Sequence, residues 1–273
     1  GVTMLEPTRS FTPVEIPGIT TATSVAAGAS RNCVLLADGK VMCWGLNDRG
    51  QLGDGTNIDR NSPVEVSGIS TAMAIEMSET YRGVELYAHS CALLIDGTVR
   101  CWGGNNYGQL GDGTNIDSNI PVSVVGIANA ASISLGGAHS CAVLTDGKVM
   151  CWGVNELGQL GDGTITDRNT PVEVPGVVSA TSVSTGEPQS CALLTDGSVM
   201  CWGSGYFGDG PYSEMRAPFD AIGIPSGVTQ IAVGRLHSCA LLTDGSVMCW
   251  GSNYQGELGD GTNIPKTVPV ATL

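Results

Sequence analysis

The sequence predicts an all-β, five-bladed β-propeller, and three observations lead to this prediction. A repeat of about 50 residues runs along the whole 273-residue chain, and periods of that length are typical of propellers and solenoids. Every repeat contains two cysteines ten positions apart, with Trp-Gly at the second one. Each repeat also reads as about four short strands separated by Gly-rich and Asp-rich turns, without helical periodicity. We expect an N-terminal arm over residues 1–12 and the propeller over residues 13–273.

The cysteines form five pairs of identical spacing: Cys33 with Cys43, Cys91 with Cys101, Cys141 with Cys151, Cys191 with Cys201, and Cys239 with Cys249. In the fourth repeat, Thr195, Asp196 and Gly197 predict a three-residue hairpin loop with a positive φ at the glycine. This register places Cys191 opposite Cys201, at a Cα separation of roughly 4.5–5.5 Å that a disulfide tolerates. Zinc sites fit poorly, because their cysteines lie two to four residues apart. We therefore expect five disulfides, each within one repeat.

The cysteines predict the location of the protein, and the charge predicts which classes of partner it does not bind. Disulfides persist in oxidising compartments, so we expect an extracellular or surface-displayed protein. The net charge is −14, and no cluster of Lys or Arg is present to neutralise phosphates, which argues against nucleic acid and anionic lipid as partners. The sequence contains no run of 18 apolar residues, so it predicts no membrane-spanning helix, and the first residues show no signal peptide. We expect no membrane insertion and an export signal that has already been removed.

One full period, residues 121–170, shows why the repeats must pack together. A Pro-Val-Ser-Val strand is followed by Ala-Ala-Ser-Ile-Ser-Leu, by the stapled hairpin and by a loop that contains Gly-Gln-Leu-Gly-Asp-Gly-Thr. Alternation places Cys141 and Val143 on one face of the hairpin and Ala142 and Trp152 on the other, so both faces are apolar. Such a sheet needs another sheet on each side, which a ring of radially packed blades supplies. We therefore expect the five blades to close into a ring.

The segments Gly136 to Gly153 and Gly158 to Thr164 resemble the repeats of the regulator of chromosome condensation family of β-propellers. The shared elements are His-Ser, Asp-Gly, Trp-Gly and Gly-Gln-Leu-Gly, which recur in this order over residues 13–273. The resemblance implies a propeller scaffold whose rims and loops bind other proteins. The best-known members have seven repeats and lack this cysteine pattern, so neither the number of blades nor the partner follows from the resemblance.

Two irregular segments of the repeat pattern are candidates for partner contacts. The spacing between the first and second cysteine pairs grows from 50 to 58 residues, with the surplus near residues 79–86, and the fourth repeat loses its Gly-Gln-Leu-Gly. Aromatic residues in loops on a rigid scaffold are candidate binding hot spots; the alternative is that they fill a degenerate blade. With two residues of the C-terminal strand, the predicted partner-binding set is Tyr81, Tyr206, Phe207, Tyr212, Phe219, Phe11, Val268 and Val270.

Metal binding and catalysis find little support in the repeat pattern. One repeat position, two before the first cysteine, holds His89, His139 and His237, with Arg31 and Gln189 in the other repeats. A metal ligand would not be replaced in this way, so we expect each imidazole to bond a neighbouring turn. The Gly-Asp-Gly-Thr turns lack the alternating ligands of a calcium loop. The inner strands are neutral apart from Glu76, and glycoside hydrolysis needs paired carboxylates. We expect no cofactor, no metal and no enzyme activity.

The Pro-Val strand occurs six times against five hairpins, at Pro13, Pro63, Pro121, Pro171, Pro218 and Pro269. One terminal copy is therefore surplus in a closed five-bladed ring. It either adds an edge strand to its own ring or completes a blade in another molecule. We predict a non-enzymatic interaction or structural module whose partner is a protein or a second copy of itself, self-assembling head-to-tail into a homopolymer. The alternative is a monomeric ligand- or receptor-binding propeller, with a glycosidase-like enzyme less favoured.

Overall fold

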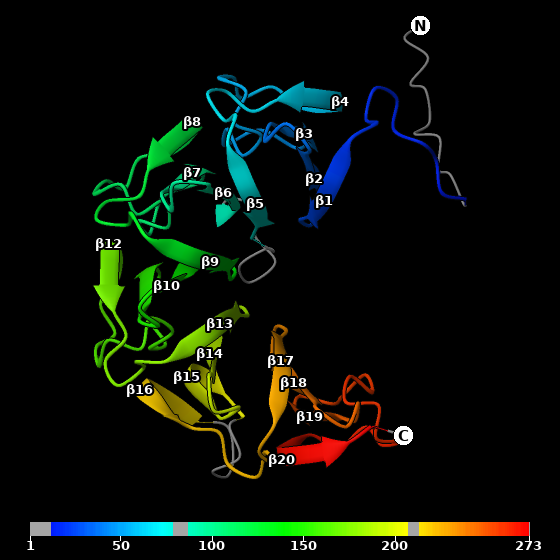
Figure 1. The fold of residues 1–273 in the computed structure, drawn as a ribbon, viewed down its shortest axis with the longest axis vertical. Coiled ribbons are helices and arrows are strands. Elements are labelled where there is room, and N and C mark those ends of the chain that lie inside the picture. Colours follow the sequence, from blue (N-terminus) through cyan, green and yellow to red (C-terminus); the bar gives the residue numbers. More distant parts are fainter. Residues whose placement is uncertain (1–11, 79–86, 207–212, 273) are drawn as a thin grey trace, which may run out of the picture.

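In a computed structural model, residues 12–78, 87–206 and 213–272 are described, and they form five four-stranded antiparallel sheets (Figure 1). Each sheet is one blade, in which four consecutive strands pair in chain order from the centre of the molecule to its rim. The regular elements of these residues are all strands, so the all-β, five-bladed fold class is confirmed. None of them forms a helix long and apolar enough to cross a membrane.

The strands follow the same order in every blade. Blade 1 contains β1 (Ala22–Ala27), β2 (Arg31–Leu36), β3 (Val41–Gly45) and β4 (Arg60–Glu65). Blade 2 contains β5 (Ala72–Met77), β6 (His89–Leu94), β7 (Val99–Gly103) and β8 (Ser118–Ser123). Blade 3 contains β9 (Ala130–Leu135), β10 (His139–Leu144), β11 (Val149–Gly153) and β12 (Arg168–Glu173). Blade 4 contains β13 (Ala180–Thr185), β14 (Gln189–Leu194), β15 (Val199–Gly205) and β16 (Ser213–Asp220). Blade 5 contains β17 (Val228–Val233), β18 (His237–Leu242), β19 (Val247–Gly251) and β20 (Lys266–Ala271).

The central hairpin of each blade has the register that the cysteine spacing predicts. In blade 4, Cys191 is paired with Cys201, and Gly197 turns the loop with a φ of 79°. In blade 2, Cys91 on β6 lies opposite Cys101 on β7 in the same register.

All five predicted disulfides are present, each with a Cα–Cα distance of 4.1 Å, slightly shorter than expected. The bonds join Cys33 to Cys43, Cys91 to Cys101, Cys141 to Cys151, Cys191 to Cys201, and Cys239 to Cys249. The disulfide pattern and the hairpin register are therefore confirmed.

The two faces of each hairpin pack against two different blades. Cys141 and Val143 of blade 3 lie in one apolar cluster with Trp202 of blade 4, whereas Ala142 and Trp152 lie in another cluster with residues of blade 2. This is the division that strand alternation predicts. Each interior blade is thus buried on both faces, and the core of the protein is a series of inter-blade layers.

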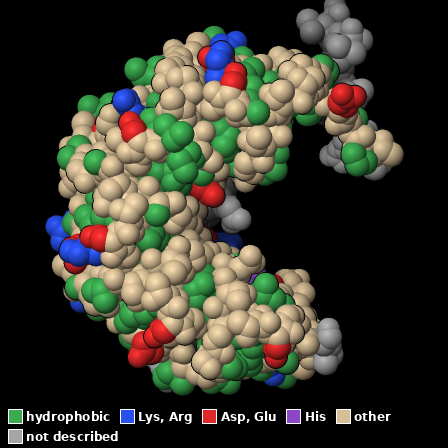
Figure 2. Space-filling model, viewed as in Figure 1, with side chains coloured by type: hydrophobic (Ala, Val, Ile, Leu, Met, Phe, Trp, Pro, Cys, Tyr) green, Lys and Arg blue, Asp and Glu red, His purple; other side chains and the backbone are tan. Residues whose placement is uncertain are grey.

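The five blades form an open arc, and the expected closure into a ring is not observed (Figure 1). The opening lies between blade 1 and blade 5, and it remains hollow when side chains are drawn (Figure 2). The same packing recurs from blade to blade, so the angle between neighbours depends on that packing and not on the number of repeats. Five blades at this angle do not complete a circle, and two blade faces are left without a neighbouring blade.

Candidate interaction surface

The first three junctions between neighbouring blades are apolar and use the same repeat positions. The hairpin of one blade provides two half-cystines and aliphatic side chains, and the next blade covers them with its inner strand and its tryptophan. Between blades 1 and 2, the first side consists of Cys33, Leu35, Val41, Cys43, Leu52, Val66 and Ile69. The second side consists of Ala72, Ile75, Met77, Ala92, Leu94 and Trp102. Burial of both sets is the main source of cohesion between blades.

One hydrogen bond of the indole orients the tryptophan in this junction. The Nε1 of Trp102 donates to the backbone oxygen of Gln51 in the preceding blade at 3.0 Å, and Ser90 Oγ donates to the same oxygen at 3.2 Å. Trp152 and Trp202 repeat the indole bond at 2.9 Å in the next two junctions. A buried indole N–H needs an acceptor. The glutamine backbone oxygen of each Gly-Gln-Leu-Gly loop provides that acceptor for the tryptophan of the following blade.

Blade 1 presents the second side of such a junction with no blade in front of it. Val25 is 75% exposed, whereas Ile75 at the same repeat position is 3% exposed. Trp44 is only half-buried, whereas Trp102 is fully buried. Blade 1 therefore exposes an apolar face that is buried in the interior blades, and we call it the blade 1 face (Ala22, Val25, Ala27 and Trp44).

A groove of about 360 Å³ runs along the blade 1 face. Besides Val25 and Trp44, it is lined by Ile16 and Ile19 from the segment that precedes β1. Its lining is mostly apolar, and it opens towards solvent at the gap in the arc. An apolar groove of this kind at the end of a packed series is a candidate protein-binding surface.

Blade 5 presents the first side of a junction at the other end of the arc. Cys239, Leu241 and Val247 are half-buried, whereas the equivalent Cys33 and Val41 of blade 1 are 0% exposed. A shallow groove runs over these residues. The two ends of the arc therefore carry the two complementary halves of one junction.

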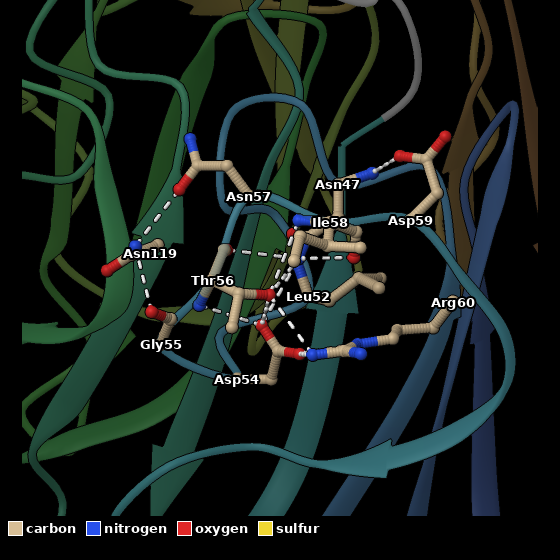
Figure 3. Close-up of polar contacts among 10 residues, drawn as sticks. All are labelled: Asn47, Leu52, Asp54, Gly55, Thr56, Asn57, Ile58, Asp59, Arg60 and Asn119. Carbon is tan, nitrogen blue, oxygen red and sulfur yellow. Dashed lines mark hydrogen bonds and ion pairs between the residues drawn. The ribbon is translucent and has the colours of Figure 1, made fainter.

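The loop that follows the hairpin in blades 1, 2, 3 and 5 is held together by a buried asparagine, shown for Asn47 in Figure 3. The Nδ2 of Asn47 lies 3.2 Å from Asp54 Oδ1, 3.0 Å from the backbone oxygen of Thr56 and 3.1 Å from that of Ile58. Its Oδ1 accepts the N–H of Leu52 at 2.9 Å. The amide nitrogen thus lies among three oxygens of the loop and donates to them. No three His, Cys, Asp or Glu residues within the described ranges gather closely enough to hold a metal ion.

The aspartate of this loop is held in its charged form. Burial alone raises the pKa of Asp54, but hydrogen bonds from Thr56 and Arg60 outweigh it, and the net pKa is lowered. The guanidinium Nη2 of Arg60 lies 2.6 Å from the Asp54 carboxylate. At the rim, Asn119 of β8 donates to the backbone oxygen of Gly55 at 3.1 Å and ties blade 2 to the loop of blade 1 (Figure 3). These contacts make the loops structural connectors between blades.

The histidine position also joins blades. His89 Nε2 lies 2.8 Å from Ser140 Oγ of the next blade, and His139 Nε2 lies 2.9 Å from Ser190 Oγ. These two side chains therefore bond the next hairpin across the junction, a partner that the sequence did not predict. Burial lowers the pKa of each of these two histidines to about 3, so both are neutral. Gln189 Nε2 makes the corresponding bond to blade 5, at 3.4 Å from Ser238 Oγ, and also lies 3.2 Å from the backbone oxygen of His237.

The predicted partner-binding residues fall in three kinds of place. Outside the described residues lie Tyr81, Phe207, Tyr212 and Phe11. Phe219 is paired with Cys201 and packs against the junction of blades 4 and 5, which favours the alternative that it fills a degenerate blade. Tyr206 is half-buried just after β15, and Val270 is half-buried opposite Cys249. Val268, at 46% exposure on β20, is accessible. A partner role for this set remains a prediction.

The carboxylate of Glu76 lines a small polar pocket at the ends of the inner strands. Burial raises its pKa. Glu187, in the turn after β13, lines the same pocket and forms an ion pair with Arg235. Sequence reasoning missed Glu187 because it lies outside the inner strand. The Arg235 guanidinium thus pairs with one of the two carboxylates that line this pocket.

Sequence reasoning also missed the blade 1 face. Val25 and Trp44 have the residue types that every repeat has at these positions, so nothing in their own repeat marks them as exposed. The one available signal was the count of six Pro-Val strands against five hairpins.

Comparison with known sequences places this architecture in a family of repeat propellers. Two sequence models of the regulator of chromosome condensation (RCC1) repeat match, one at residues 22–51, 130–159, 181–209 and 228–257 and the other at residues 38–78, 96–143 and 146–193. Together these matches cover well over half of the chain. The protein therefore belongs to the RCC1 repeat family.

Curated relatives share only part of their length with this chain. The ultraviolet-B receptor UVR8 of Arabidopsis thaliana is 34% identical over 97 residues, which are 36% of this chain and 21% of the receptor. The human E3 ubiquitin-protein ligase HERC2 is 34% identical over 99 residues, which are 34% of this chain and 2% of the ligase. The chain thus spans a small fraction of these relatives, which include both a receptor and an enzyme.

Solved structures share the fold. Human WBSCR16 superposes with a TM-score of 0.80 and 24% identity, over 91% of this chain and 66% of that chain. Prp20p of Saccharomyces cerevisiae, whose structure was described with its binding to Gsp1p and histones, superposes with a TM-score of 0.74 and 22% identity, over 92% of this chain and 63% of that chain. The disulfides of the present chain indicate a location outside the cytosol.

Proposed function

We propose that this protein is a non-enzymatic, extracellular protein-interaction module that binds through the ends of its arc. The net charge of −14 favours a protein partner over nucleic acid. The proposal is also supported by the protein-binding properties described for Prp20p. Five disulfides stabilise the blades in an oxidising environment without any contribution from a ligand.

The observation that carries the proposal is the blade 1 face. Its residues are those that bury themselves against another blade at the interior junctions, yet Val25 is 75% exposed. Burying a side chain of this size is worth about 1.5–3 kcal/mol. A contiguous apolar face with a tryptophan at its centre has the composition of a binding hot spot.

A differential capture experiment tests this function. The tagged protein, isolated from the medium or cell surface of its source, should carry a protein partner, and Val25→Asp should lose it. Met73→Asp is the matched control, because Met73 is also exposed, at 55%, but lies on β5 away from the gap. Equal capture by both variants, or a protein recovered with free thiols, would contradict the proposal.

Self-association through the terminal strands is the second candidate. It is favoured by Val14 at the N-terminal end and Val268 on β20, which are 66% and 46% exposed. Light scattering over a concentration series should then show assemblies that Val14→Asp and Val268→Asp convert to folded monomers. Point changes are preferable to deleting residues 264–273, because β20 is an integral strand of blade 5. A wild-type monomer at high concentration would exclude this candidate.

A further inference from the structure

The segment before β1 has the sequence of an outer strand. Residues 12–18 read Thr-Pro-Val-Glu-Ile-Pro-Gly. Residues 170–176, which begin within the outer strand β12 and include its C-terminal end, read Thr-Pro-Val-Glu-Val-Pro-Gly. The C-terminal copy of this motif is β20, which is already the outer strand of blade 5. The surplus sixth copy is therefore the N-terminal one, and no described sheet contains it.

The segment also has the local geometry of an outer strand and its turn. Gly18 has a φ of 84°, and Gly176 at the same repeat position has a φ of 88°. The N–H of Ile19 donates to the oxygen of Ile16 at 3.4 Å, as the N–H of Val177 does to Val174 at 3.4 Å. The turn that leads from an outer strand into the next blade is thus already formed ahead of blade 1.

The side chains of this segment lack the neighbours that their equivalents have. Val14 is 66% exposed, whereas Val172 at its repeat position pairs with Cys151 and packs against the core of its blade. Ile16 is half-buried, whereas Val174 is 0% exposed. Ile16 and Ile19 already line the groove on the blade 1 face. What the groove lacks is a hairpin with its two half-cystines, its aliphatic residues and its connecting loop.

We propose that residues 12–18 and the blade 1 face together form an acceptor site for a three-stranded, disulfide-stapled repeat of this same type that has no outer strand of its own. The inner strands and hairpin of that unit fill the groove, and its loop carbonyl accepts the indole N–H of Trp44. Residues 12–18 then complete its sheet as the fourth strand, which is a form of β-strand addition. This proposal rests on the proposed function, because it names the partner of the same surface.

The interior junctions determine what the partner must be. At each of the first three junctions, residues at the same repeat positions cover the face that is equivalent to the blade 1 face. These junctions therefore specify the surface that a partner of the blade 1 face must present. Blade 5 of a second copy presents a hairpin face of this kind, but it offers no sheet edge for residues 12–18, because each of the five described sheets already contains four strands.

A designed extension of the full chain tests the fit. In the extended chain, a second copy of residues 128–169, which hold the first three strands of blade 3 and its loop, replaces residues 1–11 directly before Thr12. The copied unit should form its disulfide, and Val25 and Val14 should become junction residues. Val25→Asp should then lower the denaturation midpoint as much as Ile75→Asp does, although it has little effect in the parent chain.

Each outcome decides for or against the proposal. A folded extension in which Val25→Asp and Val14→Asp stay neutral would overturn it, and so would a copied unit that remains open to protease with free thiols. Dimerisation of the parent chain that Val25→Asp abolishes would also overturn it, since the occupant would be a second copy. Ile75→Asp is the control that must be costly in both chains. If capture of a native partner depends on Val25 while the extension shows no coupling, the function stands and the proposed occupant is wrong.

Discussion

Among single residues, two buried histidines contribute to the response of the protein to acid. His89 and His139 have a pKa of about 3 in the folded chain against 6.5 for an ordinary histidine. The unfolded state therefore binds more protons between these two pH values, and the free energy of unfolding falls as the pH decreases from about 6.5. The loss amounts to roughly 1 kcal/mol per pH unit for each histidine within that window.

Replacing His139 should reduce this acid sensitivity. Gln189 already makes the inter-blade bond at the same repeat position, so His139→Gln retains a side chain that can bond Ser190 and removes the titrating group. Denaturant unfolding at pH 7 and pH 5 should show a smaller difference for the variant than for the wild type. An unchanged difference would show that the imidazole is not the titrating group.

The loop asparagine is a second residue with a large expected effect. Asn105 is 0% exposed, its Nδ2 lies 3.2 Å from the oxygen of Thr114, and its Oδ1 accepts the N–H of Leu110 at 2.9 Å. Asn105→Ala leaves these groups unpaired, at a cost of about 2–3 kcal/mol of unfolding free energy. The exposed Asn115→Ala is the control and should cost less than about 1 kcal/mol. Equal effects in a urea titration would contradict the structural role of the buried amide.

At the level of the blade, the disulfide is a local staple between directly opposed residues. Cys141 and Cys151 close a loop with a sequence separation of 10, for which the chain-entropy model gives roughly 2.5–3 kcal/mol as an upper figure. Replacing both cysteines by alanine should lower the free energy of unfolding by about 1–3 kcal/mol and leave the other four bridges intact. Peptide mapping without reduction checks the pairing, and any linkage between repeats would contradict the hairpin register.

In the whole molecule, the open arc gives residues at equivalent repeat positions different solvent exposure. Val25 and Ile75 occupy the same repeat position, but they are 75% and 3% exposed. Val25→Asp should change the free energy of unfolding by less than about 1 kcal/mol, whereas Ile75→Asp should cost about 4 kcal/mol or more, because it buries a charge. Equal losses in denaturant unfolding would mean that blade 1 is covered and that the ring is closed in solution.

Much of this architecture follows from residues that are near one another in the sequence. The hairpin register depends on the ten-residue cysteine spacing and on a glycine with positive φ, and alternation then decides which hairpin residues face each neighbouring blade. The candidate binding surface is different, because Val25 and Trp44 match their counterparts in the buried junctions. Their exposure depends on whether another blade lies in front of them.

The sequence by itself determined the repeat, the four strands of each blade, the five disulfides and the two apolar faces, because these depend on spacing within about 50 residues. Only the tertiary structure decided that the arc stays open, that the N-terminal Pro-Val segment is the surplus strand and that histidines bond across junctions. The physical reason is that the angle between blades results from side-chain packing over the whole junction. A small difference in that angle, repeated at every junction, decides between a closed ring and an arc with two exposed faces.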